Sequence, residues 1–377
     1  MRHTTFAMGS LEGRIAVVLS FLLLAGFLFV SSASLPLSVR LTGDPWALLK
    51  RQIVGGVLGL VGLVVLWRLD YHVWEKVDDL LIGGVFVLLV LTLIPPLADG
   101  ARWLRLGPFQ FQPSEVGKVA LILYVAGSLV RRGDRVKNYR EGVLPYLFIL
   151  GLFGLVLLLQ PDSGMLLLYV VTVGFLLWVG GVPLRHLLLT LLGGLPVAGV
   201  VLFLARYRVE RLVAFLHPEA YRDTYGYQTF QSLVAVGSGG LFGRGLGASR
   251  AKLFYLPAAH NDFLFAIVAE ETGLVGALCL IGLLGALVVL GFRAARQAPD
   301  RLGALYAWGA SFLLGFQALF NLAVAVGVMP VKGLTLPFLS YGGSSLMVSL
   351  ILGGLILGVA RAGRHSTVGV LVPGGKG

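Results

Sequence analysis

The chain has 377 residues, of which 57% are hydrophobic and only 13% are charged, and its mean hydropathy is +0.89. A soluble domain of this length would carry far more charge, and a secreted protein would continue as a polar chain after its leader, so both classes are excluded. The single cysteine excludes an internal disulfide framework and a cysteine-based metal cluster. The net charge of +12 is spread over short segments between apolar runs, which indicates contact with anionic membrane lipids and no nucleic acid partner.

Apolar runs long enough to cross a bilayer recur along the whole chain. They predict an all-α polytopic integral membrane protein with ten transmembrane helices and a long extracytoplasmic loop, about 206–262, between spans seven and eight. We expect residues 1–362 to form one membrane domain and 363–377 to form a C-terminal tail. The predicted spans are 15–33, 53–67, 80–97, 114–130, 143–159, 164–181, 187–205, 263–292, 303–327 and 341–360.

Lys and Arg gather in the loops that share a side with both termini, whereas the short loops of the opposite side hold few. The positive-inside rule therefore predicts a multi-pass protein of the bacterial cytoplasmic (inner) membrane with both termini in the cytoplasm. Four segments, 98–114, 160–163, 206–262 and 328–340, then lie on the outer face, and they hold nearly all of the unusual polar residues. A site built from them would be extracytoplasmic.

The stretch RWLRLGPFQFQPSEVGK enters the fourth span with an acid and a base. Pro113 followed by Ser114 and Glu115 is a good helix start, and Glu near a helix N-terminus favours the helix dipole. Lys118 lies on the same helical face, about one turn deeper, where a charged pair is costly unless it faces a protein-lined cavity. Glu115 and Lys118 therefore predict a cavity ion pair rather than a simple cap.

Two other segments of the outer face can each be explained by a structural role as well as by a functional one. Asp162, in the turn QPDSG, would by itself be interpreted as a turn residue. In the long loop, 206–218 has the pattern of an interfacial amphipathic helix, and 228–236 that of a short amphipathic or re-entrant helix. The glycine-rich turn 237–247 that follows is equally consistent with a phosphate site and with a flexible linker.

The stretch LPAAHNDFLFAIVAEETG, residues 256–273, concentrates polar residues at the start of the eighth span. Asn261 or Asp262 is a plausible N-cap. A helix over 263–292 would be about 45 Å long, longer than the hydrocarbon core, so its outer turns would project into an outward cavity, with Asp262 at the lip and Glu270 and Glu271 about 12 to 14 Å further in. Beside His260, Asp262 is the candidate general base, with a pKa raised by partial burial.

The segment between the last two spans, 328–340, breaks helix at Met329-Pro330 and again at Leu336-Pro337, with Lys332 between them. Small residues follow at 340–345. Irregular backbone near a membrane is tolerated where it is buried in protein or lines a cavity. This segment is therefore expected to border the same cavity.

Together these segments resemble the SEDS family of shape, elongation, division and sporulation proteins, which includes RodA, FtsW and SpoVE. The family signature is carried by Asn321, GVMP at 327–330, Gly333 and FLSYGGSS at 338–345, while RWL, FQPSE with Lys118, QPDSG and the EE.G stretch occur in family order. The resemblance covers the chain from the first span to Arg361 and is slightly greater to RodA. The chain departs from the family at Asn261, where Thr or Ser is usual, and at Met165, where Thr is common.

The resemblance implies a peptidoglycan glycosyltransferase that polymerises lipid II into β-1,4 glycan strands for cell elongation and shape, together with a class B penicillin-binding protein. It implies that Asp262 is the essential acid and that Glu115 and Lys118 form a required pair. A divalent cation, Mg²⁺ or Mn²⁺, or basic side chains would stabilise the departing pyrophosphate. The residues expected to bind substrate or pyrophosphate are Arg102, Arg244, Arg250, Lys332 and Ser344, and the expected supporting residues are His260, Asp162, Gln112 and Glu271.

Two other functions would use the same segments. A lipid II flippase, or another transporter of lipid-linked sugars, also needs a polar cavity, although the chain has no pair of broken spans at matching positions of two halves. A non-catalytic scaffold that recruits a synthase would leave Glu115, Lys118 and Asp262 without a role.

Overall fold

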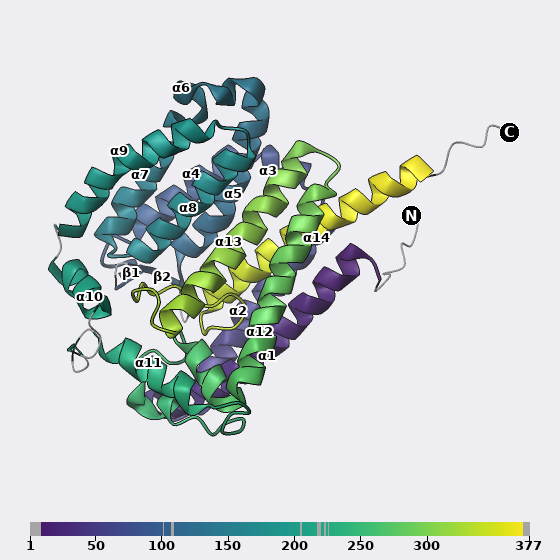
Figure 1. Cartoon of the computed structure of the whole chain (residues 1–377). Coiled ribbons are helices and arrows are strands. Elements are labelled where there is room, and N and C mark those ends of the chain that lie inside the picture. Colours follow the sequence, from purple (N-terminus) through teal and green to yellow (C-terminus); the bar gives the residue numbers. More distant parts are fainter. Residues whose placement is uncertain are drawn as a thin grey trace.

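The structure is a computed structural model and describes residues 9–100, 102–106, 109–203, 206–216, 220–221, 224 and 226–371. In this part of the chain, long helices run side by side through the molecule (Figure 1). They are α1 (Leu11–Thr42), α2 (Ala47–Arg68), α4 (Asp78–Leu91), α5 (Pro113–Arg132), α7 (Leu144–Leu159), α8 (Ser163–Val179), α9 (Leu184–Phe203), α12 (Leu264–Arg296), α13 (Arg301–Ala325) and α14 (Gly343–Leu371).

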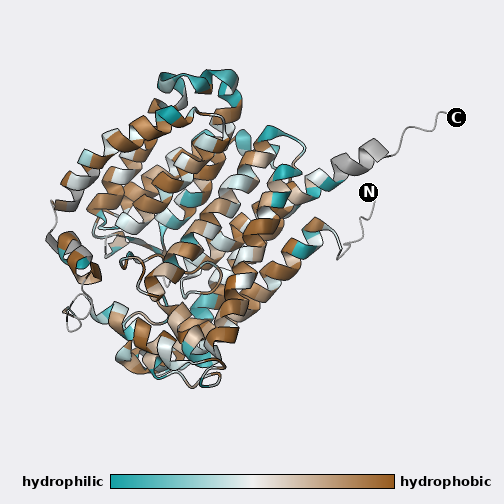
Figure 2. Ribbon diagram, viewed as in Figure 1, coloured by the Kyte–Doolittle hydropathy of each residue, from teal (hydrophilic) through white to brown (hydrophobic). Residues whose placement is uncertain are grey.

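Each of the ten predicted spans corresponds to one of these helices, which confirms the predicted fold class. Seven helices within the described ranges are long and apolar enough to cross a membrane: α1, α2, α5, α7, α12, α13 and α14. The helices α4, α8 and α9 pack beside them with shorter apolar stretches. Figure 2 shows hydrophobic residues along the helices and hydrophilic residues at α6 (Tyr139–Gly142).

The centre of the bundle is formed by α5, α13 and α14, whose apolar stretches are the most buried. The most extensive packing joins α2 to α14, and glycines make it possible. A β-carbon at Gly55 would lie 2.5 Å from the α-carbon of Gly343, and one at Gly354 would lie 2.6 Å from the α-carbon of Leu63. Close helix contact through small residues is typical of membrane bundles, because lipid gives helices little hydrophobic reason to associate.

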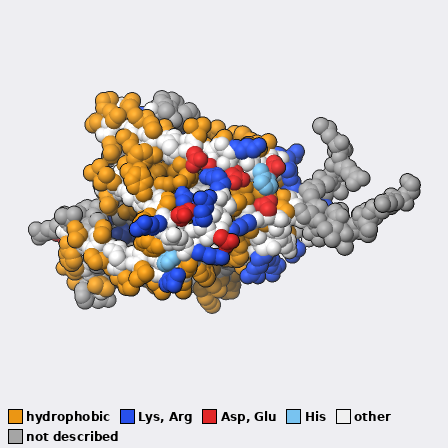
Figure 3. Space-filling view, turned by 90° about the horizontal axis from the view of Figure 1, so that it is seen from above, with side chains coloured by type: hydrophobic (Ala, Val, Ile, Leu, Met, Phe, Trp, Pro, Cys, Tyr) orange, Lys and Arg blue, Asp and Glu red, His pale blue; other side chains and the backbone are white. Residues whose placement is uncertain are grey.

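The two ends of the bundle differ (Figure 1). One end carries α3 (His72–Glu75), α6 and η1 (Gly133–Lys137), and Figure 3, which views the molecule from above this end, shows many Lys and Arg side chains there. The other end, which we call the cavity end, carries a small sheet, α10 (Arg206–Leu216) and α11 (Tyr227–Ser238). The helices α10 and α11 confirm the two short helices predicted in the long loop; residues 217–218 lie outside the described residues.

The sheet was not predicted. It has three antiparallel strands in the order β1 (Ala98–Asp99), β2 (Trp103–Leu106) and β3 (Phe109–Phe111). Strands of two to four residues are too short for an alternating pattern to stand out from the sequence. The sheet runs directly into α5, so it positions Arg102, Arg105 and Gln112 beside the first turn of that helix.

The prediction of one continuous helix over 263–292 was wrong. Gly273 has φ 68° and ψ −167°, a conformation essentially restricted to glycine, and it divides α12 into a buried segment of residues 264–272 and a longer membrane segment. The loop 240–245 supplies the hydrogen bonds that the break removes. These are Arg244 N to Glu270 O (3.0 Å), Gly245 N to Glu271 O (3.0 Å), Leu274 N to Gly240 O (2.9 Å) and Val275 N to Leu241 O (3.2 Å).

The other end of the chain also differs from the prediction. Residues 363–371, expected to begin a tail, continue α14 as helix.

Candidate active site

A cavity of about 930 Å³ lies at the cavity end between α2, the sheet, α5 and the segments that precede α8, α12 and α14. We call it the central cavity. Six of the residues predicted from the sequence line it, although they come from five separate segments of the chain. They are Arg102, Gln112, Glu115, Asp162, Asp262 and Ser344.

Asp262 lies half-buried in the cavity wall, in the turn just before α12. Burial raises the pKa of its carboxyl to about 6, the nearby charge of Asp162 acts in the same direction, and Arg102 and Arg211 oppose the shift. The hydrogen bond that Asn321 makes to Asp262 uses the main-chain carbonyl oxygen and not this carboxylate. A carboxylate with a raised pKa that is open to a cavity is suited to accept a proton from a bound molecule.

The main chain around Asp262 is firmly held. Asn321, on α13, donates from Nδ2 to the carbonyl oxygens of Asp262 (2.8 Å) and Leu334 (2.7 Å). Ser340 Oγ donates to the carbonyl oxygen of Asn261 at 2.6 Å. The main-chain N–H of Tyr341 donates to the carbonyl oxygen of His260 at 2.9 Å. The turn that carries Asp262 is therefore fixed to α13 and to the segment before α14.

Glu115 and Lys118 form an ion pair on the first turns of α5, with 4% and 1% of their side chains exposed. Lys118 Nζ also donates to Gln317 Oε1 at 3.0 Å, and Gln317 Nε2 donates to the carbonyl oxygen of Thr335 at 2.9 Å. Thr335 Oγ1 and Ser345 Oγ share a hydrogen bond of 2.7 Å. The predicted pair is thus present, and a chain of polar side chains joins it to the segment before α14.

Asp162 accepts from Met165 N at 3.2 Å, so it caps α8, and it also faces the central cavity. Gln112 Nε2 donates to its carboxylate at 3.4 Å. Arg102 Nε donates to the carbonyl oxygen of Gln160 at 2.8 Å and holds the turn that carries Asp162. Burial raises the pKa of Asp162, which the positive charge of Arg102 opposes. The turn and the cavity interpretations of Asp162 therefore both hold.

Four predicted residues lie away from the central cavity. Arg244 pairs with Glu270 (Nη1 to Oε1, 3.1 Å), and Lys252 pairs with the buried Glu271 at 2.9 Å. Glu270 also accepts from the main-chain N–H of Arg250 at 3.1 Å. The structure therefore does not bring Arg244, Arg250 and Glu271 to Asp262, because the break at Gly273 turns these groups towards the glycine-rich loop. Lys332 is likewise not among the lining residues.

This arrangement also involves turn 237–247, which was considered both as a phosphate site and as a flexible linker. The main-chain N–H groups of Gly243, Arg244 and Gly245 donate to carbonyl oxygens of the protein itself. The turn thus completes the broken helix α12.

His260 lies outside the cavity lining, and its ring packs on Tyr341 with centroids 5.5 Å apart. Burial lowers the pKa of its imidazole to about 4, so it is neutral at pH 7. Within the described residues its contribution to the site is the main-chain hydrogen bond from Tyr341.

Several lining residues were missed. Arg51 on α2 and Arg105 on β2 add positive charge to the cavity, and Asn261 presents an Oδ1 atom with no hydrogen-bond partner in the described part of the chain. Arg51 and Arg105 were interpreted only as loop charges, because nothing in the sequence brings α2 to the same cavity as α5. An arginine at the start of an otherwise apolar span is the signal that was available.

Comparisons with known proteins agree with this site. A family model described as "Cell cycle protein", covering FtsW, RodA and SpoVE, matches residues 14–365. A probable peptidoglycan glycosyltransferase FtsW from Geobacter sp. (strain M18) is 42% identical over 343 residues, 90% of this chain and 94% of the relative. One from Saccharophagus degradans is 41% identical over 358 residues, 93% of this chain and 91% of the relative.

Two solved structures are similar along almost their whole length. A chain of a structure described as "Structural coordination of polymerization and crosslinking by a peptidoglycan synthase complex" is 34% identical with a TM-score of 0.77, over 93% of this chain and 97% of that one. The rod shape determining protein RodA of Thermus thermophilus is 30% identical with a TM-score of 0.64, over 95% and 98%.

The fold and the cavity define a polytopic membrane protein with a polar, carboxylate-containing site at one end of its helix bundle. Within that class, the chain belongs to the SEDS family of FtsW, RodA and SpoVE proteins.

Proposed function

We propose that this chain is a peptidoglycan glycosyltransferase that polymerises lipid II into β-1,4 glycan strands. The observation that carries the proposal is Asp262, a carboxylate with a raised pKa that faces a cavity lined by Arg51, Arg102 and Arg105. Relatives named as probable peptidoglycan glycosyltransferases, 41–42% identical over nine-tenths of the chain, support it.

In the proposed reaction, the Asp262 carboxylate takes the proton of the acceptor's 4-hydroxyl group. The hydroxyl oxygen then bonds to the anomeric carbon of the donor sugar as the bond from that carbon to the pyrophosphate breaks, and displacement from an α-linked donor gives the β-linkage. The cavity arginines meet the negative charge that develops on the leaving pyrophosphate, since guanidinium groups form paired, charge-assisted hydrogen bonds to phosphate oxygens.

The carboxylates of the central cavity fit a divalent cation if substrate phosphates supply further ligands. Among the described residues there is no group of three or more His, Cys, Asp or Glu that could hold a metal ion. Mg²⁺ is, however, commonly bound by one or two carboxylates together with substrate phosphates. We propose that Asp162, together with the phosphates of the substrate, would hold Mg²⁺ or Mn²⁺ in this way, and that the ion would neutralise the pyrophosphate.

We further propose that both termini are cytoplasmic and that the cavity end faces outward. The support is the Lys and Arg at the α6 end, among them Arg131, Arg132, Arg135 and Lys137, set against the polar cavity at the other end. A class B penicillin-binding protein is the proposed partner, because cross-linking must follow polymerisation and a similar chain belongs to a peptidoglycan synthase complex.

The test is polymerisation of lipid II by purified protein in liposomes, with and without a class B penicillin-binding protein and a divalent cation. We expect glycan strands from the wild type and none from Asp262→Asn. Movement of lipid II across the bilayer without polymer would support the flippase alternative instead.

The sequence favoured a role in cell elongation over division, and the curated relatives are named FtsW. Depletion in the native organism separates the two roles. Loss of an elongation enzyme rounds the cells, whereas loss of a division enzyme leaves filaments.

A further inference from the structure

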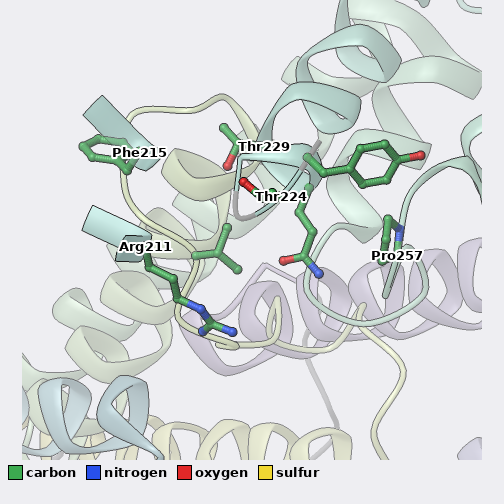
Figure 4. Close-up of a pocket in the computed structure, with 8 residues that line it drawn as sticks. Arg211, Phe215, Thr224, Thr229 and Pro257 are labelled. Carbon is green, nitrogen blue, oxygen red and sulfur yellow. The ribbon is translucent and has the colours of Figure 1, made fainter. Parts of the chain in front are cut away.

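A second, smaller cavity of about 260 Å³ lies between α10 and α11, and we call it the α10–α11 pocket (Figure 4). Arg211 and Phe215 border it from α10, and Thr224 and Thr229 lie across from them, with Pro257 at its edge. None of these residues takes part in the reaction proposed above.

The α10–α11 pocket and the central cavity share two walls. Pro257 belongs to the same turn as Asp262, and Val331 lies just before Gly333, so each of these two segments borders the pocket on one side and the central cavity on the other. The pocket is held in place from α11, where Ser232 Oγ donates to the carbonyl oxygen of Ala325 at 2.7 Å. Asp262 therefore lies at the boundary between two cavities.

The two cavities are also linked electrostatically. The positive charge of Arg211 lowers the pKa of Asp262 against the larger effect of burial. The guanidinium group of Arg211 is thus near enough to act on the carboxylate that faces the central cavity.

The lining of the pocket is suited to bind a small anion. It combines the guanidinium of Arg211 with neutral donors on Thr224, Tyr227, Gln228 and Thr229, and the lining residues that the structure describes include no Asp or Glu. A guanidinium surrounded by hydroxyl and amide donors is a typical phosphate-binding set. The volume is below the 300 to 1,000 Å³ or so of common ligand pockets, so the pocket suits one charged group rather than a disaccharide with its peptide.

We propose that the α10–α11 pocket binds the diphosphate of a second lipid-linked substrate molecule. The inference rests on the proposed function, because joining two lipid-linked sugars requires that both are bound at once. One substrate would occupy the central cavity and the other would be anchored at Arg211. The two sugars would then meet at Asp262 from opposite sides.

The kinetic test uses Arg211→Gln in the full-length protein. We expect the lipid II concentration that gives half-maximal rate to rise by about tenfold or more, the effect of losing a hydrogen bond to a charged group, while the maximal rate is largely kept. Arg211→Lys keeps the charge but not the planar guanidinium group. Its half-maximal lipid II concentration should therefore lie between those of the wild type and Arg211→Gln. The matched control is Arg40→Gln. Arg40 lies over the Phe254 ring, 4.9 Å from its centroid, and lines neither cavity, so the concentration dependence should not change.

A binding test does not depend on activity. Calorimetric titration with inorganic pyrophosphate should reveal two sites in the wild type and one in Arg211→Gln. If Arg211→Gln does not fold, the double variant Thr224→Val, Gln228→Leu should weaken the same site. The pocket proposal is overturned if folded variants keep two pyrophosphate sites and reach half-maximal rate at the same lipid II concentration as the wild type. Failure of the wild type to polymerise lipid II overturns the proposed function, and the pyrophosphate titration still decides whether the pocket binds diphosphate.

Discussion

The side-chain amide of Asn321 donates a 2.8 Å hydrogen bond to the main-chain carbonyl oxygen of Asp262. The same amide group donates to the carbonyl oxygen of Leu334 at 2.7 Å. One buried side chain on α13 therefore joins the segment before α12 to the segment before α14. This places Asp262 through its main chain and leaves its carboxylate available to substrate.

Asn321→Leu should therefore lower the polymerisation rate more than it lowers stability. Two buried carbonyl groups lose their donor, which costs about 1 to 3 kcal/mol in the free energy of unfolding for each unsatisfied group. A shift of about 1 Å in Asp262 would reduce the rate by about 100-fold. Steady-state rates and thermal unfolding of the purified protein measure both effects. Asn138→Ala, which removes the cap of α6 at the opposite end, should leave the rate unchanged.

The rate should depend on pH through Asp262. A general base must be ionised, so the rate should fall as the pH drops through about 6, the raised pKa of this carboxyl. Asp162 contributes to that rise, so Asp162→Asn should move the acid limb of the pH–rate profile to lower pH, and Asn still serves as a helix cap. An acid limb that does not move in this variant would contradict the assignment.

Asp262→Asn should be more stable than the wild type at neutral pH. Because the pKa in the folded protein is about 6 and the ordinary value is 3.8, the folded state favours the protonated carboxyl, and wild-type stability is lost as the pH rises between these two values. The neutral amide avoids that loss. The difference in melting temperature should therefore grow from about pH 4 to about pH 6 and then stay constant, which thermal unfolding at several pH values would show.

Replacing one partner of the Glu115–Lys118 pair should be worse than replacing both. Lys118→Met leaves a buried carboxylate without its cation, which costs about 3 to 5 kcal/mol. The double variant Glu115→Gln, Lys118→Met removes both charges and should recover most of the stability. It should not recover polymerisation. A double variant with wild-type activity would show that the pair has only a structural role.

Glu270→Gln should reduce activity although Glu270 is outside the central cavity. Its carboxylate accepts from Ser249 Oγ at 2.5 Å and from the N–H groups of Arg250 and Ala251, which fixes the start of the segment leading to Asp262. An amide group cannot accept all of these bonds. Glu12→Gln is the matched control, since Glu12 is also buried and accepts from Trp67 Nε1 at 2.7 Å, but at the opposite end of the bundle. Equal loss of activity in the two variants would contradict a positioning role for Glu270.

Gly273→Ala should destabilise the protein, whereas Gly282→Ala in the same helix should not. A β-carbon at Gly273 would lie 2.3 Å from the backbone nitrogen of Gly243 and would require a strained φ, but one at Gly282 meets nothing within 4 Å. The strain alone costs about 1 to 3 kcal/mol. Thermal unfolding of both variants in detergent measures the contrast. Equal melting temperatures would mean that the break at Gly273 is not required.

Much of this protein follows from local sequence. Ten apolar runs specify ten helices, because a segment that crosses lipid must satisfy its backbone hydrogen bonds within itself. The Glu115–Lys118 pair was also predictable, since residues three apart on one helix must lie on the same face. Asp262 was identified from its place at the start of a long apolar span, whereas Asp162 and Arg102 entered the predicted site with the family resemblance.

Only the tertiary structure decides which polar residues meet. Arg244, Arg250 and Glu271 lie close in sequence to Asp262, yet their contacts lie elsewhere. Arg244 and Glu271 contribute main-chain hydrogen bonds that bridge the break at Gly273, and the N–H of Arg250 donates to Glu270. Arg51 is distant in sequence, yet close helix packing brings α2 to the central cavity. Hydrophobic periodicity specifies which face of a helix is buried but not which helix covers it, because apolar contacts are non-directional and the pairing depends on how side chains from distant segments fit together.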